Sequence, residues 1–472
     1  MINEPQTLEE KDKEYIWHPF TQMRDWLSEI PVVIETGKGS YLTDTKNRQY
    51  IDGTSSIWVN IHGHRKKAID KAITEQLKKI AHSTILGLSN IPSILLAERL
   101  INLAQSSGLT SISKVFYSDN GSTAVEVGLK MAFHYWQLKE GKYKKKKKFL
   151  TLENSYHGDT IGSMSLGGID LFHKIYKPLL FESFKAPSPY CYRCPLDGVY
   201  PSCNLSCAKK VEEILIKHHK EIAAIIIEPL VQAAAGIIIT PPGYLKKIRS
   251  LCTKYNVLLI ADEVATGFGR TGRMFACEHE GISPDIMAIA KGITGGYLPL
   301  AATLVTKDIF NAFLGEYKEF KTFFHGHSYT GNPLGCAAAI ANIEIFEKEG
   351  VIENIKPKIA LLEQLISPLK DQPHVGDVRQ KGLIAAIELV KDKVKKTAYP
   401  LEEKMGIRVC LEARKHGLLL RPIGNVIILM PPLSISRVDL KKMTSIVTMA
   451  IENLTGTPLP YSQPSTNKKG GR

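Results

Sequence analysis

The segment that decides the fold is VLLIADEVATGFGRTG, residues 257–272. Five apolar residues run directly into Asp262 and Glu263, and a glycine-rich turn follows them. A short apolar run bounded in this way predicts a buried strand. Carboxylates at the end of such a strand are costly to bury unless a cation meets them. A protonated heterocyclic nitrogen would serve as that cation, and a salt bridge within the core would serve equally well.

Apolar runs of similar length recur along the chain, separated by stretches with helical apolar spacing, such as 122–138 and 244–255. The expected strands are residues 115–117, 149–152, 223–228, 257–261, 286–290 and 301–305. This alternation predicts an α/β fold whose largely parallel sheet is covered by helices on both faces.

Both ends of the chain have a different pattern. Residues 31–35 and 39–44 predict a small antiparallel element, and residues 183–201 predict an irregular insertion rich in proline and cysteine. After Pro333, a helix over 334–349 and strands over 383–390 and 426–429 predict an α+β region.

The composition is that of a globular protein, with 44% hydrophobic and 23% charged residues among 472. No apolar run is long enough to span a bilayer, and the N-terminus lacks a secretory apolar segment. We therefore expect a cytoplasmic protein with no membrane partner.

The net charge is +14, from 61 basic and 47 acidic residues. Much of the clustering lies in the run Lys144–Lys148, which we expect to be a solvated connection because no aromatic residues interleave with it. A regulator that binds DNA is the alternative, but too few residues precede Trp17 for an added helix-turn-helix domain. We expect no nucleic-acid partner.

Four of the eight cysteines are clustered, at Cys191, Cys194, Cys203 and Cys207. Their spacing is similar to that of metal ligands, although the second pair is CxxxC. A zinc or iron–sulfur site, free thiols and a redox disulfide remain alternatives, and a reducing compartment argues against a stable disulfide. We expect no metal in the catalytic chemistry.

Two glycine-containing segments are candidate phosphate sites. In SDNGSTAVEVGLKMA (118–132) a strand gives way to a helix, Gly121 allows close approach of the backbone, and Ser122 can cap the helix. An ordinary capped turn would have the same pattern. The second candidate is HGHSYTGNPL (325–334), with Ser328 as a hydroxyl donor.

Lys291 follows a short apolar strand and precedes a glycine-rich turn in MAIAKGITGGYLPL (287–300). Most lysines are solvated, but a partly buried lysine has a lowered pKa and is a competent nucleophile toward a carbonyl. In NSYHGDT (154–160), Tyr156 offers an aromatic face and His157 a polar edge. An amine, an acidic partner for a ring nitrogen, a stacking aromatic and two phosphate turns together predict a pyridoxal 5'-phosphate (PLP) site.

From Trp17 to about Pro432 the sequence resembles the class III, fold-type I aminotransferases, which use PLP. The segments that carry the resemblance are WHPFTQM (17–23), DGTSSIWVNIHGH (52–64), SDNGS (118–122), SYHGDTIG (155–162), IIIEPLVQAAAG (225–236), ADEVATGFGRTG (261–272), KGITGGYLPL (291–300), HGHSYTGNPL (325–334) and RPIGNVIILMPP (421–432).

The resemblance implies a large domain with a mostly parallel seven-stranded sheet sandwiched by helices, over residues 66–344 with the insertion at 183–207. A small α+β domain would be formed by residues 1–65 and 345–460, followed by a disordered tail at 461–472.

The resemblance also implies site residues. Lys291 would be catalytic, binding the cofactor through its ε-amine and moving protons. Implied cofactor-binding residues are Gly121, Ser122, Tyr156, Glu228, Asp262, Lys291, His327 and Ser328. Implied substrate-binding residues are Phe20, Ile57, Trp58, Tyr156, Lys291, Gly326 and Arg421. The neighbouring subunit would supply His327 and Ser328, which implies an obligate homodimer with shared active sites.

The segments WHPFTQM and HGHSYTGNPL are similar to the branch that aminates 8-amino-7-oxononanoate in biotin biosynthesis. Another class III aminotransferase, acting on an ω-amino acid or a diamine, is the alternative. Phe20, Ile57 and Ile428 stand where many members carry Tyr, Trp and Tyr facing the donor S-adenosylmethionine. Some relatives with Phe at this place resemble users of L-lysine, so our hypothesis is a lysine-using or donor-ambiguous member.

Overall fold

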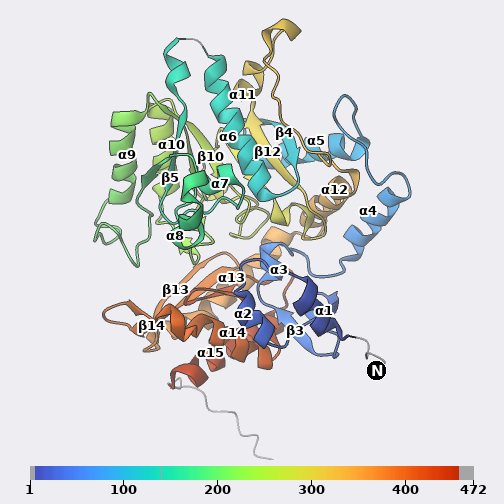
Figure 1. Cartoon of the computed structure of the whole chain (residues 1–472), viewed down its shortest axis with the longest axis vertical. Coiled ribbons are helices and arrows are strands. Elements are labelled where there is room, and N and C mark those ends of the chain that lie inside the picture. The colour runs from blue at the N-terminus through green and yellow to red at the C-terminus, as the bar shows by residue number, and fades with distance from the viewer. Residues whose placement is uncertain (1–5, 140, 457–472) are drawn as a thin grey trace, which may run out of the picture.

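The computed structural model describes residues 6–139 and 141–456, and its central layer is a seven-stranded sheet with the order β4-β12-β11-β10-β7-β5-β6 (Figure 1). The strands are β4 (Ile112–Ser118), β5 (Lys148–Leu152), β6 (Phe184–Ala186), β7 (Ile222–Ile227), β10 (Leu258–Asp262), β11 (Ile286–Ile289) and β12 (Ala301–Thr306). Only β12 runs antiparallel to its neighbours, so the predicted mostly parallel sheet is confirmed.

The six strands expected from the apolar runs are all present, and β6 is an additional one. Residues 184–186 lie in the segment expected to be irregular, and that expectation is wrong for them. They pair in parallel with Leu150–Leu152 of β5. The pairing satisfies backbone N–H and C=O groups that an unpaired β5 would leave open at the sheet edge.

Alternate residues of each strand point to opposite faces of the sheet, and helices cover both faces. Ile226 and Ile260, which are paired across β7 and β10, pack with helix α6 (Gly121–Leu138). Their chain neighbours Ile225 and Leu259 belong to the core on the other face. Helices on that face are α5 (Ile91–Ser106), α9 (Ser206–His218), α10 (Tyr244–Lys254) and α12 (Pro333–Lys348).

The smaller region combines both ends of the chain, and Figure 1 shows the blue N-terminal segment beside the orange and red C-terminal one. One sheet has the order β1-β2-β3-β16, in which Ile51 pairs in parallel with Leu418. A second sheet has the order β13-β14-β18-β17. The predicted contribution of both ends to an α+β region is confirmed. The exact domain boundaries remain predictions, and the predicted tail 461–472 lies outside the described residues.

The strands of this region are β1 (Ile34–Lys38), β2 (Tyr41–Asp44), β3 (Gln49–Asp52), β13 (Val375–Lys381), β14 (Ile384–Asp392), β15 (Thr397–Ala398), β16 (Leu418–Leu419), β17 (Pro422–Ile423) and β18 (Val426–Leu429). A separate pair is β8 (Val231–Gln232) with β9 (Ile238–Ile239). The other helices are α1 (Leu8–Tyr15), α2 (Met23–Ser28), α3 (Ser55–Trp58), α4 (Lys67–Leu77), α7 (Ile161–Ser165), α8 (Asp170–His173), α11 (Lys307–Ala312), α13 (Val351–Ile366), α14 (Met405–Lys415) and α15 (Arg437–Thr455). None of the helices over 6–139 and 141–456 has both the length and the apolar character needed to cross a membrane.

One lysine of the run before β5 contradicts the expected solvated connection. Lys146 is only 4% exposed, whereas its neighbours in the run are exposed. Its amine donates hydrogen bonds to the carbonyls of His219 (2.6 Å) and Ile222 (3.1 Å) and lies 4.7 Å from the centre of the Trp136 ring. Burial lowers the pKa of this amine to about 8. Lys146 therefore joins the end of α9 to the sheet, a role that a charge run does not reveal.

Candidate active site

Five strands end around one cavity of about 730 Å³. The strands β4, β5, β7, β10 and β11 all point their carboxyl ends toward it, as expected for ligand sites in open α/β sheets. The lining includes Trp58, Asp119–Ser122, Tyr156–Thr160, Glu228, Asp262 and Lys291. The cavity thus brings together residues more than 200 positions apart, such as Trp58 and Lys291.

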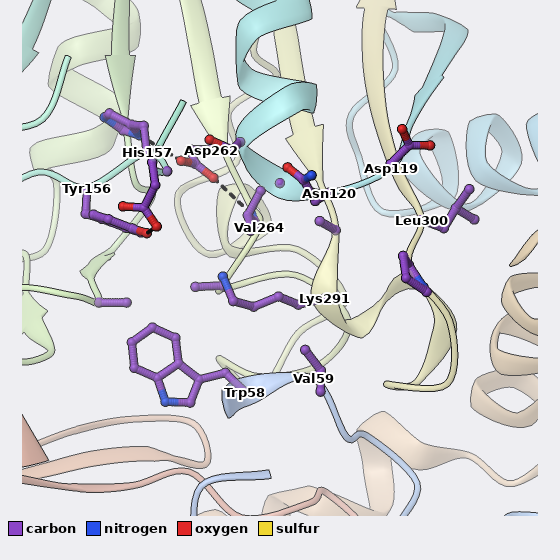
Figure 2. Close-up of a pocket in the computed structure, with 18 of the residues that line it drawn as sticks. Trp58, Val59, Asp119, Asn120, Tyr156, His157, Asp262, Val264, Lys291 and Leu300 are labelled. Carbon is purple, nitrogen blue, oxygen red and sulfur yellow. Dashed lines mark hydrogen bonds and ion pairs between the residues drawn. The ribbon is translucent and has the colours of Figure 1, made fainter. Parts of the chain in front are cut away.

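Lys291 occupies the middle of this cavity, where Figure 2 shows its side chain between Asp262 on one side and Trp58 on the other. It lies two residues after the end of β11 and begins a short 3-10 turn, with a φ of 45°. Burial lowers the pKa of its amine, although the charges of Asp262 and Glu228 oppose that shift. The amine lies 5.7 Å from the centre of the Trp58 ring. A larger fraction of this amine is therefore neutral at a given pH than for a solvated lysine.

Asp262 ends β10 and is 5% exposed. One carboxylate oxygen lies 2.7 Å from Nδ1 of His157, and the other accepts a hydrogen bond from the Val264 N–H at 3.1 Å. The structure thus adds His157 as a partner of this carboxylate. That role was not evident from the sequence because the two residues are 105 positions apart, and only the order β5-β7-β10 in the folded sheet brings them together.

Glu228 follows β7 and supports the same wall of the cavity. Its carboxylate accepts hydrogen bonds from the backbone N–H groups of Tyr156 (3.1 Å) and Ala233 (2.8 Å). Burial raises the pKa of Glu228 to about 7 despite the nearby His157. The carboxyl group therefore positions the Tyr156 backbone and is partly protonated near neutral pH.

The N-terminus of α6 forms one edge of the cavity. Asn120 caps the helix by accepting from the Thr123 N–H, and the first N–H groups of a helix have no acceptor within it. A Cβ built on Gly121 would lie 2.6 Å from Cγ1 of Val264, so any larger residue there would have to displace that side chain. The Ser122 hydroxyl accepts from the Thr160 N–H at 3.1 Å. This cradle of small residues and N–H donors suits an anion.

Six of the predicted residues do not line the cavity in the single chain. Ile57 and Phe20 are exposed, and the guanidinium of Arg421 donates to the Phe20 carbonyl at 3.1 Å. Gly326 and Ser328 are exposed, while His327 lies 2.8 Å from Asp119, which does line the cavity.

Aromatic residues connect Phe20 to the cavity. Phe20 packs edge-to-face on Phe172 with 5.4 Å between ring centres, and Phe172 packs in the same way on Tyr156 at 6.3 Å. The Tyr156 hydroxyl donates to Asp159 at 2.8 Å. Phe172 and Asp159 were not among the site residues expected from the sequence. Ile428, one of the departures noted in the sequence, is buried within β18.

Three of the four clustered cysteines lie between β6 and α9, and the fourth, Cys207, lies in the first turn of α9. Cys191 is exposed, Cys207 is buried on α9, and the Cys194 sulfur accepts from the Gly198 N–H at 3.3 Å. Across residues 6–139 and 141–456, no group of three or more His, Cys, Asp or Glu side chains is arranged to hold a metal ion.

These features place the protein in a family: the chain belongs to the class III aminotransferases, whose family description matches residues 23–451. It is 51% identical over 452 residues to the adenosylmethionine-8-amino-7-oxononanoate aminotransferase of Geobacter sulfurreducens, covering 96% of this chain and 98% of that protein. It is 50% identical to the enzyme of the same name from Staphylococcus aureus, covering 96% and 99%.

Solved structures agree with this assignment. The adenosylmethionine-8-amino-7-oxononanoate aminotransferase of Methanocaldococcus jannaschii superposes with a TM-score of 0.89 at 46% identity, covering 94% of this chain and 98% of that one. A PLP-bound amine transaminase from an uncultivated Pseudomonas species superposes with a TM-score of 0.87 at 37% identity, covering 93% and 99%. The predicted fold class is confirmed.

Proposed function

We propose that the protein is a PLP-dependent aminotransferase that transfers an amino group to 8-amino-7-oxononanoate, giving 7,8-diaminononanoate, in biotin biosynthesis. The observation that carries the proposal is the placement of the Lys291 amine and the Asp262 carboxylate in one cavity beside the N-terminus of α6. The choice of substrate rests on relatives about half identical over almost the whole chain.

The residues present fit PLP. The cradle at Gly121, which an added Cβ would fill, and the hydroxyl of Ser122 suit the phosphate. Asp262 suits the protonated ring nitrogen, and Tyr156 would stack on the ring. The buried Nε2 of His157 has no hydrogen-bond partner within the described residues. A polar atom beside Asp262 is therefore free to bond the cofactor. When bound, PLP supplies an electron-accepting ring and an aldehyde carbon that exchanges between amines.

Within this site the protein's own groups have distinct roles. The amine of Lys291 would hold the cofactor through its aldehyde carbon, with release of water, and the free amine would accept and return a proton at Nζ. The hydrogen bond with His157 fixes the orientation of the Asp262 carboxylate. That carboxylate would stabilise the positive charge on the protonated ring nitrogen of the cofactor. Trp58 forms a wall of the cavity beside the amine.

We further propose a homodimer in the cytoplasm. His327, Ser328 and Gly326 would complete the site of the neighbouring subunit, since none of them lines the cavity of their own chain. Several exposed apolar side chains support an interface, including Leu86, Leu88, Ile91, Phe324 and Tyr329. Arg421 would bind a substrate carboxylate, for which its planar fork is suited.

The first test is chemical. Borohydride reduction of the PLP-loaded protein followed by peptide mass spectrometry should find the adduct on Lys291, and an adduct elsewhere would refute the site. A substrate panel then decides the reaction. Turnover of 8-amino-7-oxononanoate well above that of ω-amino acids and simple amines supports the proposal, and the reverse order favours the amine-transaminase alternative.

The amino donor is a separate question. Mixing the PLP form with S-adenosylmethionine or with L-lysine, and following the cofactor's absorbance, reports each half-reaction on its own. Conversion by lysine supports the lysine hypothesis drawn from Phe20 and Ile57, whereas rapid conversion by S-adenosylmethionine alone would contradict it.

A further inference from the structure

Helix α3 is a left-handed turn built from residues other than glycine. Ser55, Ser56, Ile57 and Trp58 all have φ values between 49° and 69°. The N–H of Trp58 donates to the Thr54 carbonyl at 2.8 Å. Left-handed helical backbone is unfavourable for every residue that carries a Cβ, and most of all for a β-branched residue such as Ile57. Such a conformation persists only where the surroundings hold it.

The carboxylate of Asp52, at the end of β3, provides that restraint. One of its oxygens accepts from the Ser56 N–H at 2.9 Å, and the other accepts from the Ser56 hydroxyl at 2.8 Å. Nε2 of His64 bonds the second oxygen at 2.9 Å. The His64 backbone is in turn paired with Gly39 by two hydrogen bonds. The turn is therefore tied through one carboxylate to two separate parts of the chain.

Two further contacts hold the ends of the turn. The Ser55 hydroxyl donates to the Met430 carbonyl at 2.6 Å. The buried guanidinium of Arg270 donates to the carbonyls of Asn60 (2.7 Å) and Pro431 (2.6 Å). The first residue of the turn is thus attached directly to the loop after β18, and Arg270 bridges that loop to Asn60, two residues beyond the turn.

Asp52 is 2% exposed, so its charge is retained against a desolvation penalty. Burial favours the protonated form, but the bonds from His64 and Ser56 outweigh burial and lower its pKa below the ordinary value. A buried charge that accepts three hydrogen bonds is costly to disturb. A protonated or truncated side chain would release Ser56, the second residue of the turn.

The turn ends at Trp58, whose ring lies in the cavity 5.7 Å from the Lys291 amine. We propose that Asp52 is a positioning residue for the reaction: through Ser56 and His64 it stabilises the left-handed turn and thereby sets where the Trp58 indole stands in the substrate cavity. Asp52 does not itself line the cavity. The kinetic part of this inference rests on the proposed function, and the structural part does not.

The test uses PLP-loaded protein labelled with 5-fluorotryptophan. The fluorine resonance of Trp58 is assigned by its loss in Trp58→Phe. The variants are Asp52→Ala, Asp52→Asn and the double variant Asp52→Ala/Ser56→Gly, because glycine adopts positive φ without the steric penalty of serine and so depends less on Asp52 at this position. The matched control is Asp44→Ala, which removes a buried carboxylate from the neighbouring strand β2. That carboxylate accepts from the Arg48 and Tyr50 side chains and does not contact the turn.

We expect Asp52→Ala, which removes all three hydrogen bonds to this carboxylate, to shift or broaden the Trp58 resonance and to raise KM for 8-amino-7-oxononanoate about tenfold. PLP occupancy, followed by absorbance, should be unchanged. Adding Ser56→Gly should recover most of the wild-type resonance and KM. Asp52→Asn keeps one acceptor oxygen, so its Trp58 resonance and its KM should fall between those of the wild type and of Asp52→Ala. This variant decides the test if the alanine variant does not fold.

An unchanged Trp58 resonance in both Asp52 variants would overturn the proposal. The same shift in Asp44→Ala would also overturn it, because the effect would then be general destabilisation. If the wild-type protein did not turn over 8-amino-7-oxononanoate, the proposed function would fail while the fluorine spectra still decided the role of Asp52.

Discussion

Replacing Gly121 with alanine tests the phosphate cradle directly. The added methyl would lie 2.6 Å from Cγ1 and 3.1 Å from Cγ2 of Val264, well inside the ordinary carbon contact of about 3.5–4.0 Å. Overpacking of this kind costs roughly 1–3 kcal/mol, and the higher helix propensity of alanine returns up to about 1 kcal/mol. We therefore expect the free energy of unfolding of Gly121→Ala to fall by about 1–2 kcal/mol.

The same displacement should weaken cofactor binding, because the first N–H groups of α6 move with the helix end. A loss of about 1.4 kcal/mol corresponds to a tenfold higher Kd for PLP. The assay is absorbance titration of the cofactor-free protein with PLP, paired with urea unfolding of the same preparation. Gly335→Ala is the matched control, since its added Cβ would meet the Pro299 carbonyl at an ordinary 3.5 Å.

Val264→Ala removes the methyl groups that the new Cβ would strike. The double variant Gly121→Ala/Val264→Ala should therefore bind PLP more tightly than Gly121→Ala alone, with a coupling energy of about 1 kcal/mol. Wild-type affinity in Gly121→Ala, or a defect that Val264→Ala leaves unchanged, would refute the steric account of the cradle.

Further predictions concern titratable groups. Lys291→Ala should abolish turnover and the borohydride-stable adduct, measured by mass spectrometry, while PLP can still bind noncovalently. Asp262→Asn should lower kcat on the order of 100-fold with PLP retained, and an unchanged kcat would remove this carboxylate from the mechanism. Burial raises the pKa of the Glu228 carboxyl to about 7. Its contribution to the free energy of unfolding is therefore fully present below the unfolded pKa of 4.5 and is lost as the pH rises to about 7. Glu228→Gln should remove this pH dependence from the free energy of unfolding measured in urea. Lys146 shows the opposite case, because burial lowers the pKa of its amine to about 8. Between about pH 8 and 10.5 the unfolded state binds more protons than the folded state, so the free energy of unfolding should rise with pH. Lys146→Met should remove that rise.

The sequence alone was sufficient for the parts that depend on local patterns. Apolar runs of three to six residues identified the strands whose ends surround Asp262 and Lys291, because a buried parallel strand needs little more than a continuous apolar segment. The glycine at 121 and the lysine at 291 followed from the same logic, since ligands bind where such strands end. Resemblance then supplied the order of these segments and the family.

Tertiary structure decided everything that needs a partner from a distant segment. The pairing of His157 with Asp262 and the burial of Lys146 each join residues far apart in the sequence, so no local pattern contains them. The left-handed turn at Ser55–Trp58 is the strongest case, because its sequence contains no glycine to signal it. Intrinsic preference opposes that turn, and only the carboxylate of Asp52, His64 and the loop after β18, assembled by the fold, make it the stable conformation.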